Sequence, residues 1–415
     1  MTQRKGRWRL GLQRLVEWHP IQEVERVGPE EPSDLPIERF WEATRKLYQT
    51  GLHPAIGLHI RHRGRVVLNR TVGHTTNPPG GPSGAVVTPD TLFNLFSASK
   101  IVTGTLVMAL AEDGVFGLHD RVVDHLPEFG QHGKTQVQIQ HLLNHTAGIP
   151  NMPKITDLEQ LLGQGGIDIG RICAMRPDSA PGQVTAYHAL TAGFVLQEIV
   201  ERRTGKDLRS LLRSRLMAPL GFKHLSYGVA SDLLPEVAQH AVTGLPMPRA
   251  VAHLLSRNLG LDLHSAIDAS NRAEFMTAIL PSANVIGSAQ EMARFMDLLM
   301  AGGELDGVRV LKEETVREMV TDVTPTRIDR TYQLPMRYGL GVMMGGNRFS
   351  LFGLGTPEAF GHIGLSAVVV YADPARELSV AFMNSGKPMF APGMIRWYAV
   401  LQAIASGVPV SRATR

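Results

Sequence analysis

Strand-like segments lie at both ends of this 415-residue chain, and helix-like segments lie between them. Residues 55–73 alternate apolar and polar side chains on both sides of Arg63-Gly64, which predicts two strands joined by a turn. Further strands are predicted near the C-terminus, at 338–345, 365–371 and 377–384. Because every strand needs a partner, we expect the strands of both ends to form one antiparallel sheet.

The middle of the chain has helical periodicity. We predict helices at 97–114, at 188–205, at 288–303, where Ser288 and Glu291 resemble a capping box, and at 393–407. The expected fold is α/β, an antiparallel sheet flanked by helices with an inserted, mostly helical domain. The expected division is a basic N-terminal extension (1–30), a sheet domain (31–95 and 275–415) and a helical domain (96–274).

The segment FNLFSASKIV, residues 93–102, combines two serines with a lysine at the start of a predicted helix. Ser97 and Lys100 are three residues apart, so their side chains share one helix face. A lysine amine among apolar neighbours loses its charge more readily, and a neutral amine can take the proton of a serine hydroxyl. The helix start also supplies backbone N–H groups for an oxyanion. The alternative reading is a serine cap followed by a solvent-facing lysine.

Two later stretches favour the catalytic reading. PGQVTAYHALTAG, residues 181–193, carries Tyr187 just before a predicted helix. A phenol beside an amine can transfer protons. FGHIGLSAVVVY, residues 360–371, places His362 and Gly364 at the start of a predicted strand, where glycine allows a close approach of the backbone to a substrate.

The order and spacing of these motifs resemble a known superfamily. Together with HLLNHTAGI, MAPLGF and DGVRVLKEETVREM, they resemble the serine β-lactamase-related proteins over roughly residues 40–400. Within that group the chain is most similar to the family VIII carboxylesterases, which are related to class C β-lactamases and D,D-peptidases. The resemblance implies a β-lactamase/D,D-peptidase-like fold and acyl transfer without a cofactor or metal.

The resemblance also implies residue roles. Ser97 would be the acylated nucleophile, Lys100 its partner, and Tyr187 the general base or proton shuttle. Whether the lysine or the tyrosine is the acylation base is left open, since such a pair can titrate as a unit. His362, Ile363 and Gly364 would form the third motif, with His362 and Gly364 binding substrate. The backbone N–H groups of Ser97 and Leu365 would form the oxyanion hole.

Two departures from the lactamase pattern favour an esterase. The lactamases present a cationic lysine where this chain has His362, which is mostly neutral near pH 7. Ala189 replaces the asparagine of the Tyr-x-Asn motif and removes an amide that would bind an acylamide. We therefore expect a serine carboxylesterase or lipase-type hydrolase of small-molecule esters, including lipid-derived ones. The alternatives are a D,D-peptidase or β-lactamase, an acyltransferase of the same fold, and a non-enzymatic regulator or scaffold.

The composition and short motifs exclude several other kinds of site. Cys173 is the single cysteine, which excludes an internal disulfide, and no H-E-x-x-H zinc motif or G-x-S-x-G elbow occurs. The net charge of +4 includes five basic residues within the first sixteen, interleaved with apolar ones. This segment is not recognised as a signal peptide, so we expect a cytoplasmic protein that can touch an anionic membrane peripherally. No nucleic-acid partner is expected, and the oligomeric state is open.

Several other residues are expected to be structural. His141 and His145 in HLLNHTAGI look like catalytic candidates, but the resemblance gives them no proton to move. We expect them to fix a loop by hydrogen bonds. The methionines at 292, 296 and 300 follow helical spacing and are expected to pack in the core.

Overall fold

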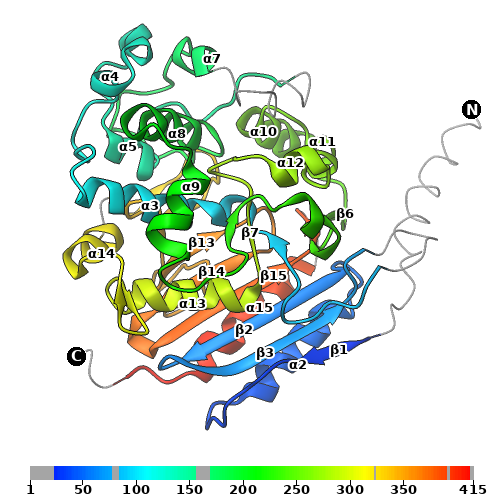
Figure 1. The fold of residues 1–415 in the computed structure, drawn as a ribbon. Helices are drawn as coiled ribbons and strands as arrows, with labels where there is room; N and C mark the ends of the chain where they lie inside the picture. The colour runs from blue at the N-terminus through cyan, green and yellow to red at the C-terminus, as the bar shows by residue number, and fades with distance from the viewer. Residues whose placement is uncertain (1–22, 77–83, 156–168, 322–323, 390–392, 412–415) are drawn as a thin grey trace, which may run out of the picture.

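The computed structural model describes residues 23–76, 84–155, 169–321, 324–389 and 393–411 (Figure 1). Its main sheet has seven antiparallel strands in the order β1-β3-β2-β15-β14-β13-β12. The strand bounds are β1 Glu25–Val27, β2 Ala55–His62, β3 Arg65–Gly73, β12 Met343–Met344, β13 Phe360–Ile363, β14 Val369–Asp373 and β15 Leu378–Asn384. The predicted single sheet, built from both ends of the chain, is confirmed.

The predicted hairpin forms where the sequence placed it. Arg63 and Gly64 both have positive φ angles, of 54° and 74°, as a two-residue turn between twisted strands requires. Strand β2 then pairs along its whole length with β15, with His59 opposite Ala381. This pairing joins the N-terminal hairpin to the C-terminal strands.

Helices cover both faces of the sheet (Figure 1). On one face, α2 (Ile37–Tyr48) packs against α15 (Gly393–Gly407), and their apolar side chains share a core with Ile56, Val380 and Phe382. On the other face, α13 (Ala289–Met300) lies across β2, β14 and β15. Met292 and Met296 are fully buried there, as expected for core residues.

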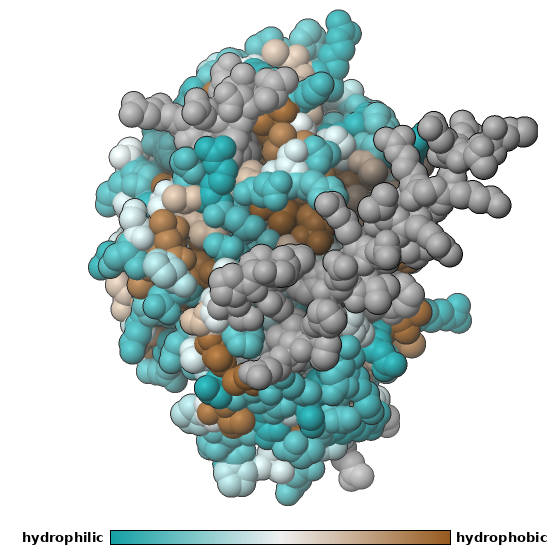
Figure 2. All heavy atoms as spheres, turned by 90° about the vertical axis from the view of Figure 1, so that its right-hand side faces the viewer, coloured by the Kyte–Doolittle hydropathy of each residue, from teal (hydrophilic) through white to brown (hydrophobic). Residues whose placement is uncertain are grey.

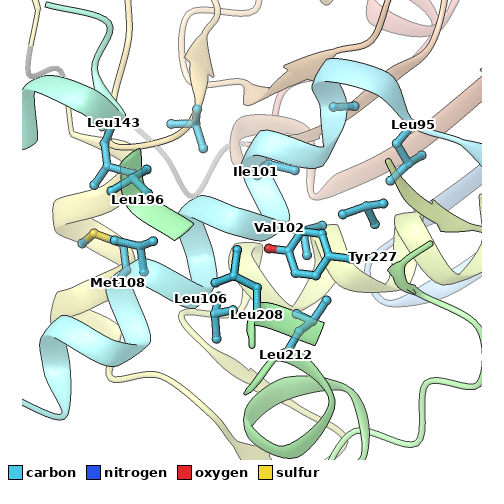
Figure 3. Packing of buried hydrophobic residues seen from close by; sticks show 14 of the residues in the cluster. Leu95, Ile101, Val102, Leu106, Met108, Leu143, Leu196, Leu208, Leu212 and Tyr227 are labelled. Atoms are coloured by element: carbon cyan, nitrogen blue, oxygen red, sulfur yellow. The ribbon is translucent and has the colours of Figure 1, made fainter. Parts of the chain in front are cut away.

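The helix α3 (Ser99–Glu112) runs through the centre of the larger core. It is buried on every side up to Leu110, and Figure 3 shows Ile101, Val102 and Leu106 among side chains of several other helices. Gly104 allows the backbone of Gly341 to approach so closely that an added Cβ would lie 3.0 Å from its Cα. A side chain at the start of α3 therefore enters an environment with little water.

The middle of the chain is mostly helical, as predicted. Its helices include α5 (Ile139–Leu143), α8 (Thr191–Thr204), α9 (Leu208–Leu212), α10 (Arg249–Leu259), α11 (Leu263–Ser270), α12 (Ala273–Thr277) and α14 (Glu313–Val320). A small sheet of β4 (Phe93–Asn94), β7 (Val285–Gly287) and β5 (Ser226–Tyr227) connects this part to the main sheet, and β6 (Ala241–Thr243) pairs in parallel with β16 (Gly386–Pro388). The predicted domain limits at 95 and 275 stay a prediction.

Three local predictions need correction. The strand expected at 338–345 is reduced to Met343–Met344, because Gly341 has a φ of +78° that no strand residue adopts. The strand expected from 365 begins only at Val369, after a turn in which Ser366 has a φ of +51°. Ser288 does cap α13, but the Glu291 carboxylate accepts the N–H groups of Lys223 and His224 instead of closing a capping box.

Candidate active site

The two serines of the SASK segment have different environments. Ser97 lies in the 3-10 turn η1 (Phe96–Ala98), between β4 and α3, and is partly exposed. Ser99 is fully buried, and its hydroxyl oxygen accepts the Val285 N–H at 2.9 Å. Ser99 thus holds β7 against α3, whereas the Ser97 hydroxyl is left within reach of solvent.

Lys100 points back from α3 toward Ser97. Its Nζ lies 3.2 Å from Ser97 Oγ, 2.7 Å from the carbonyl oxygen of Ala189 and 3.3 Å from that of Ser282. The side chain is buried, and burial lowers the Lys100 pKa well below its usual value. A neutral amine has two N–H groups and one lone pair. In the neutral form of Lys100, the two carbonyls, which can only accept, would take the two N–H groups and leave the lone pair for the Ser97 hydroxyl.

Tyr187 completes the cluster from the loop before α8. Lys100 Nζ lies 4.8 Å from the centre of its ring. Its hydroxyl is buried and has no hydrogen-bond partner of good geometry among the described residues. Burial raises the Tyr187 pKa, although the Ser97 and Tyr332 side chains face the hydroxyl closely enough to offset part of that rise. Tyr187 is therefore a protonated phenol at neutral pH.

The third motif lies at the end of β13. His362 is buried, and the centre of its ring is 6.0 Å from that of Tyr187. Burial, and next the nearby Lys100, lower the His362 pKa to about 3, so the imidazole is neutral. Gly364 lies against the backbone before Ser97, since an added Cβ would sit 2.2 Å from the Leu95 carbonyl oxygen. Ordinary side chains do not fit there.

The two predicted oxyanion donors lie in neighbouring segments. Leu365 packs in one apolar cluster with Phe96, the residue before Ser97. Within the described part of the chain, the backbone N–H groups of Ser97 and Leu365 have no hydrogen-bond partner. Both are thus available to a ligand.

Sequence reasoning missed the conformation of Phe96. Its φ of +47° is unusual for a bulky residue and marks stored backbone strain. Asn94 Oδ1 accepts its N–H at 3.1 Å, and its ring lies 4.6 Å from the His240 ring and 4.9 Å from Lys387 Nζ. The fold thereby holds the residue next to Ser97 through three contacts. A positive φ at phenylalanine leaves no signal in the sequence.

A buried carboxylate behind Tyr187 was also missed. Asp329 accepts the N–H groups of Thr331 at 2.8 Å and Tyr332 at 2.9 Å, and the Tyr338 hydroxyl at 3.0 Å. These bonds hold the loop that places the Tyr332 ring 4.8 Å from the Tyr187 ring. Asp329 therefore orients the tyrosine indirectly.

The two histidines of HLLNHTAGI both accept backbone N–H groups. His141 Nδ1 accepts that of Gln138 at 3.1 Å, and His145 Nδ1 accepts that of His188 at 3.2 Å. Their geometry agrees with the predicted structural role. His145 nevertheless lies closer to the site than expected, with its ring 4.6 Å from that of Tyr187.

Comparisons with known proteins agree with this architecture. Residues 43–405 match the Beta-lactamase family. The chain belongs to that family. It is 31% identical over 312 residues to the esterase/beta-lactamase LipL of Mycobacterium tuberculosis, covering 72% of this chain and 70% of the relative.

Solved structures of β-lactamase-family relatives superpose over nearly the whole chain. A penicillin-binding protein homolog from Caulobacter crescentus matches with a TM-score of 0.76 at 25% identity, covering 92% of this chain and all of the other (100%). EstA from Arthrobacter nitroguajacolicus Rue61a matches with a TM-score of 0.72 at 27% identity, covering 91% and 99%. The predicted fold and the resemblance to the esterase branch of this superfamily are confirmed.

Proposed function

We propose that this protein is a serine ester hydrolase that cleaves small-molecule carboxylic esters through an acyl-enzyme on Ser97. The observation that carries the proposal is the environment of Lys100. Its amine is buried with a pKa lowered well below the usual lysine value, two carbonyls accept from it, and its Nζ lies 3.2 Å from the Ser97 hydroxyl. Relatives named as esterases support the same chemistry.

Acylation follows from this arrangement. The Lys100 lone pair takes the hydroxyl proton while Ser97 Oγ attacks the ester carbonyl carbon. The carbonyl oxygen becomes negative and is stabilised by the N–H groups of Ser97 and Leu365. Tyr187 is a poorer base than Lys100, because burial raises its pKa and favours the phenol. This contrast favours Lys100 as the acylation base.

Tyr187 fits the role of proton donor and shuttle. As the tetrahedral intermediate collapses, the bond from carbon to the alcohol oxygen breaks, and the phenol protonates the leaving alkoxide. Lys100, which then carries the serine proton, lies 4.8 Å from the centre of the Tyr187 ring and reprotonates the phenolate. A water molecule then attacks the acyl carbon and passes a proton to the neutral Lys100 amine. The bond from the acyl carbon to Ser97 Oγ breaks, Oγ takes that proton from Lys100, and the acid is released.

The apolar side chains around Ser97 favour esters with apolar groups. Phe96 packs with Leu263 and Ile267 of α11, and Leu365 joins the same cluster. The face that carries α10, α11 and β6 is turned toward the viewer in Figure 2, where hydrophobic side chains gather near the middle of a largely hydrophilic surface. We therefore propose short or medium acyl esters, including lipid-derived ones, as the substrate class.

The geometry disfavours β-lactams and peptide tails. His362 is neutral where the lactamases have a cation, and Ala189 contributes only its carbonyl, which accepts from Lys100. An assay with nitrocefin beside p-nitrophenyl butyrate separates the two functions, and we expect only the ester to turn over efficiently. Added alcohol acceptors show whether acyl transfer competes with hydrolysis.

The direct test of the proposal is Ser97→Ala. Without the nucleophile, the burst of p-nitrophenol and steady-state ester hydrolysis should both disappear while the circular dichroism spectrum stays unchanged. Tyr187→Phe and Lys100→Ala should each lower the acylation rate by about 10³-fold, which corresponds to about 4 kcal/mol of barrier. A burst that persists in Ser97→Ala contradicts the nucleophile assignment.

We also propose that the basic first sixteen residues touch anionic membranes, as their charge pattern predicts. Residues 1–22 lie outside the described part of the chain. None of the described helices is both long and apolar enough to cross a bilayer. Cosedimentation of the full chain and of a variant lacking residues 1–22 with phosphatidylserine vesicles tests the proposal.

A further inference from the structure

His362 presents one unused hydrogen-bond acceptor toward the catalytic groups. It lies on β13, on the side of the sheet that faces α3, and is 1% exposed. The centre of its ring is 6.0 Å from that of the Tyr187 ring. The imidazole is therefore a neighbour of the Tyr187 side chain in the proposed catalytic cluster.

The hydrogen bonds of His362 define which nitrogen carries the proton. Nδ1 lies 2.7 Å from the backbone carbonyl oxygen of Ile363, and a carbonyl oxygen can only accept. Nδ1 therefore carries the hydrogen. Because the imidazole is neutral, Nε2 has a lone pair and no hydrogen. Nε2 is buried and has no partner among the described residues.

The main chain on both sides of His362 is packed closely against its neighbours. An added Cβ at Gly361 would lie 2.1 Å from the Val370 carbonyl oxygen, and one at Gly364 would lie 2.2 Å from that of Leu95. Both contacts hold β13 tightly between its neighbours. The main chain is thus held in place, and the ring is oriented by the bond from Nδ1 to the Ile363 carbonyl oxygen.

A buried acceptor without a partner destabilises the free protein, and a ligand that donates a hydrogen bond removes that cost. A carboxylate has no hydrogen to donate, so its oxygen lone pairs would face the Nε2 lone pair and be repelled by it. Lys387 is fully buried, with its Nζ 4.9 Å from the centre of the Phe96 ring. No described residue at this position therefore favours the binding of an acidic substrate.

We propose that the substrate donates a hydrogen bond to His362 Nε2 through a hydroxyl group, as a hydroxy ester or a partial ester of a polyol does. This inference rests on the proposed ester hydrolysis and specifies its substrate class. The hydroxyl lies beside the scissile ester, on its acyl or its alcohol side.

Matched ester pairs test the inference. Ethyl butyrate is compared with ethyl 3-hydroxybutyrate for the acyl side, and propyl butyrate with glyceryl monobutyrate for the alcohol side. The wild-type protein should hydrolyse the hydroxylated member of at least one pair with a kcat/KM about tenfold or more higher, as expected for one satisfied buried acceptor. The half ester ethyl hydrogen succinate should be slower than ethyl butyrate.

Two variants serve as matched controls. In His362→Asn, the amide can replace Nδ1 but nothing reaches the Nε2 position, so the preference for the hydroxyl should vanish. In His362→Gln, the amide oxygen reaches the Nε2 position and should keep part of the preference. Circular dichroism shows whether both fold.

The outcomes separate this inference from the proposed function. If the wild type shows no hydroxyl preference, or His362→Asn lowers kcat/KM equally for both members of a pair, the subsite assignment is wrong while ester hydrolysis stands. If no ester is cleaved in a Ser97-dependent manner, the proposed function itself fails.

Discussion

Lys387→Met should stabilise this protein at neutral pH. Lys387 is fully buried, its Nζ has one acceptor among the described residues, the Asn384 carbonyl oxygen at 2.7 Å, and it faces the Phe96 ring. Burial lowers its pKa to about 7. Since the folded pKa lies below the unfolded value of 10.5, the unfolded chain binds the proton more tightly, and stability rises with pH between about 7 and 10.5.

The size of the effect follows from this window. Each pKa unit corresponds to about 1.4 kcal/mol, so at pH 7 the lysine destabilises the fold by up to roughly 5 kcal/mol. Methionine has a similar shape and removes this cost, but it also removes a hydrogen bond that contributes about 1 kcal/mol. We expect a net gain of about 2–4 kcal/mol at pH 7, or a rise in Tm of about 2–5 °C for a chain of this size.

Differential scanning calorimetry of the wild type and Lys387→Met at pH 7 and pH 10 measures the effect. The advantage of the variant should shrink at pH 10, where the wild-type lysine is neutral in the folded state. Lys134→Met is the matched control, because the fully buried Lys134 donates to three carbonyls, those of Gln131, Cys173 and Met175. That variant should be less stable than the wild type. A Lys387→Met protein that is less stable at pH 7, or a difference independent of pH, refutes the reasoning.

Three further outcomes follow from the site. Ser99→Ala should lower the free energy of unfolding by about 1–3 kcal/mol, because the buried Val285 N–H loses its acceptor. The kcat/KM of the folded variant should stay within about twofold of the wild type. If Ser99→Ala loses as much activity as Ser97→Ala, this would argue against Ser97 as the reactive serine. Gly364→Ala should lower kcat by about 10²-fold by displacing β13 from the nucleophile, whereas Gly57→Ala, whose Cβ finds only contacts of 3.6 Å or more, should leave kcat unchanged. The kcat/KM of the wild type should fall tenfold per pH unit below the lowered Lys100 pKa, because protonation occupies the lone pair of the amine. If Lys100→Met shows the same fall at acidic pH, Lys100 is excluded as its source.

Local patterns made the core of the site predictable from the sequence. The pair Ser97 and Lys100 depends only on helical spacing, and the apolar residues beside it indicate a buried amine. The predicted strands β2, β3 and β15 are also present; each places apolar side chains in the smaller core, and β15 places Ala381 and Met383 in the larger one. Where the hydrophobic periodicity of a segment matches the burial of its side chains, the predicted element is present in the structure.

Other features depend on contacts that the sequence does not encode locally. The choice between Ser97 and Ser99 is decided by Val285, far along the chain. The second carbonyl partner of Lys100 comes from Ser282, which carries no motif. Tyr332 reaches the site only because Asp329 holds its loop. The strand expected at 338–345 failed because Gly341 adopts a positive φ to meet α3.

The central claim is that a neutral Lys100 activates Ser97. Labelling with a fluorophosphonate, followed by peptide mass spectrometry, measures it most directly when the wild type and Lys100→Met are compared. The wild type should carry the label on Ser97, and Lys100→Met should react about 10³-fold more slowly at the same residue. Equal labelling rates in the two proteins, or a label on a residue other than Ser97, would contradict the account.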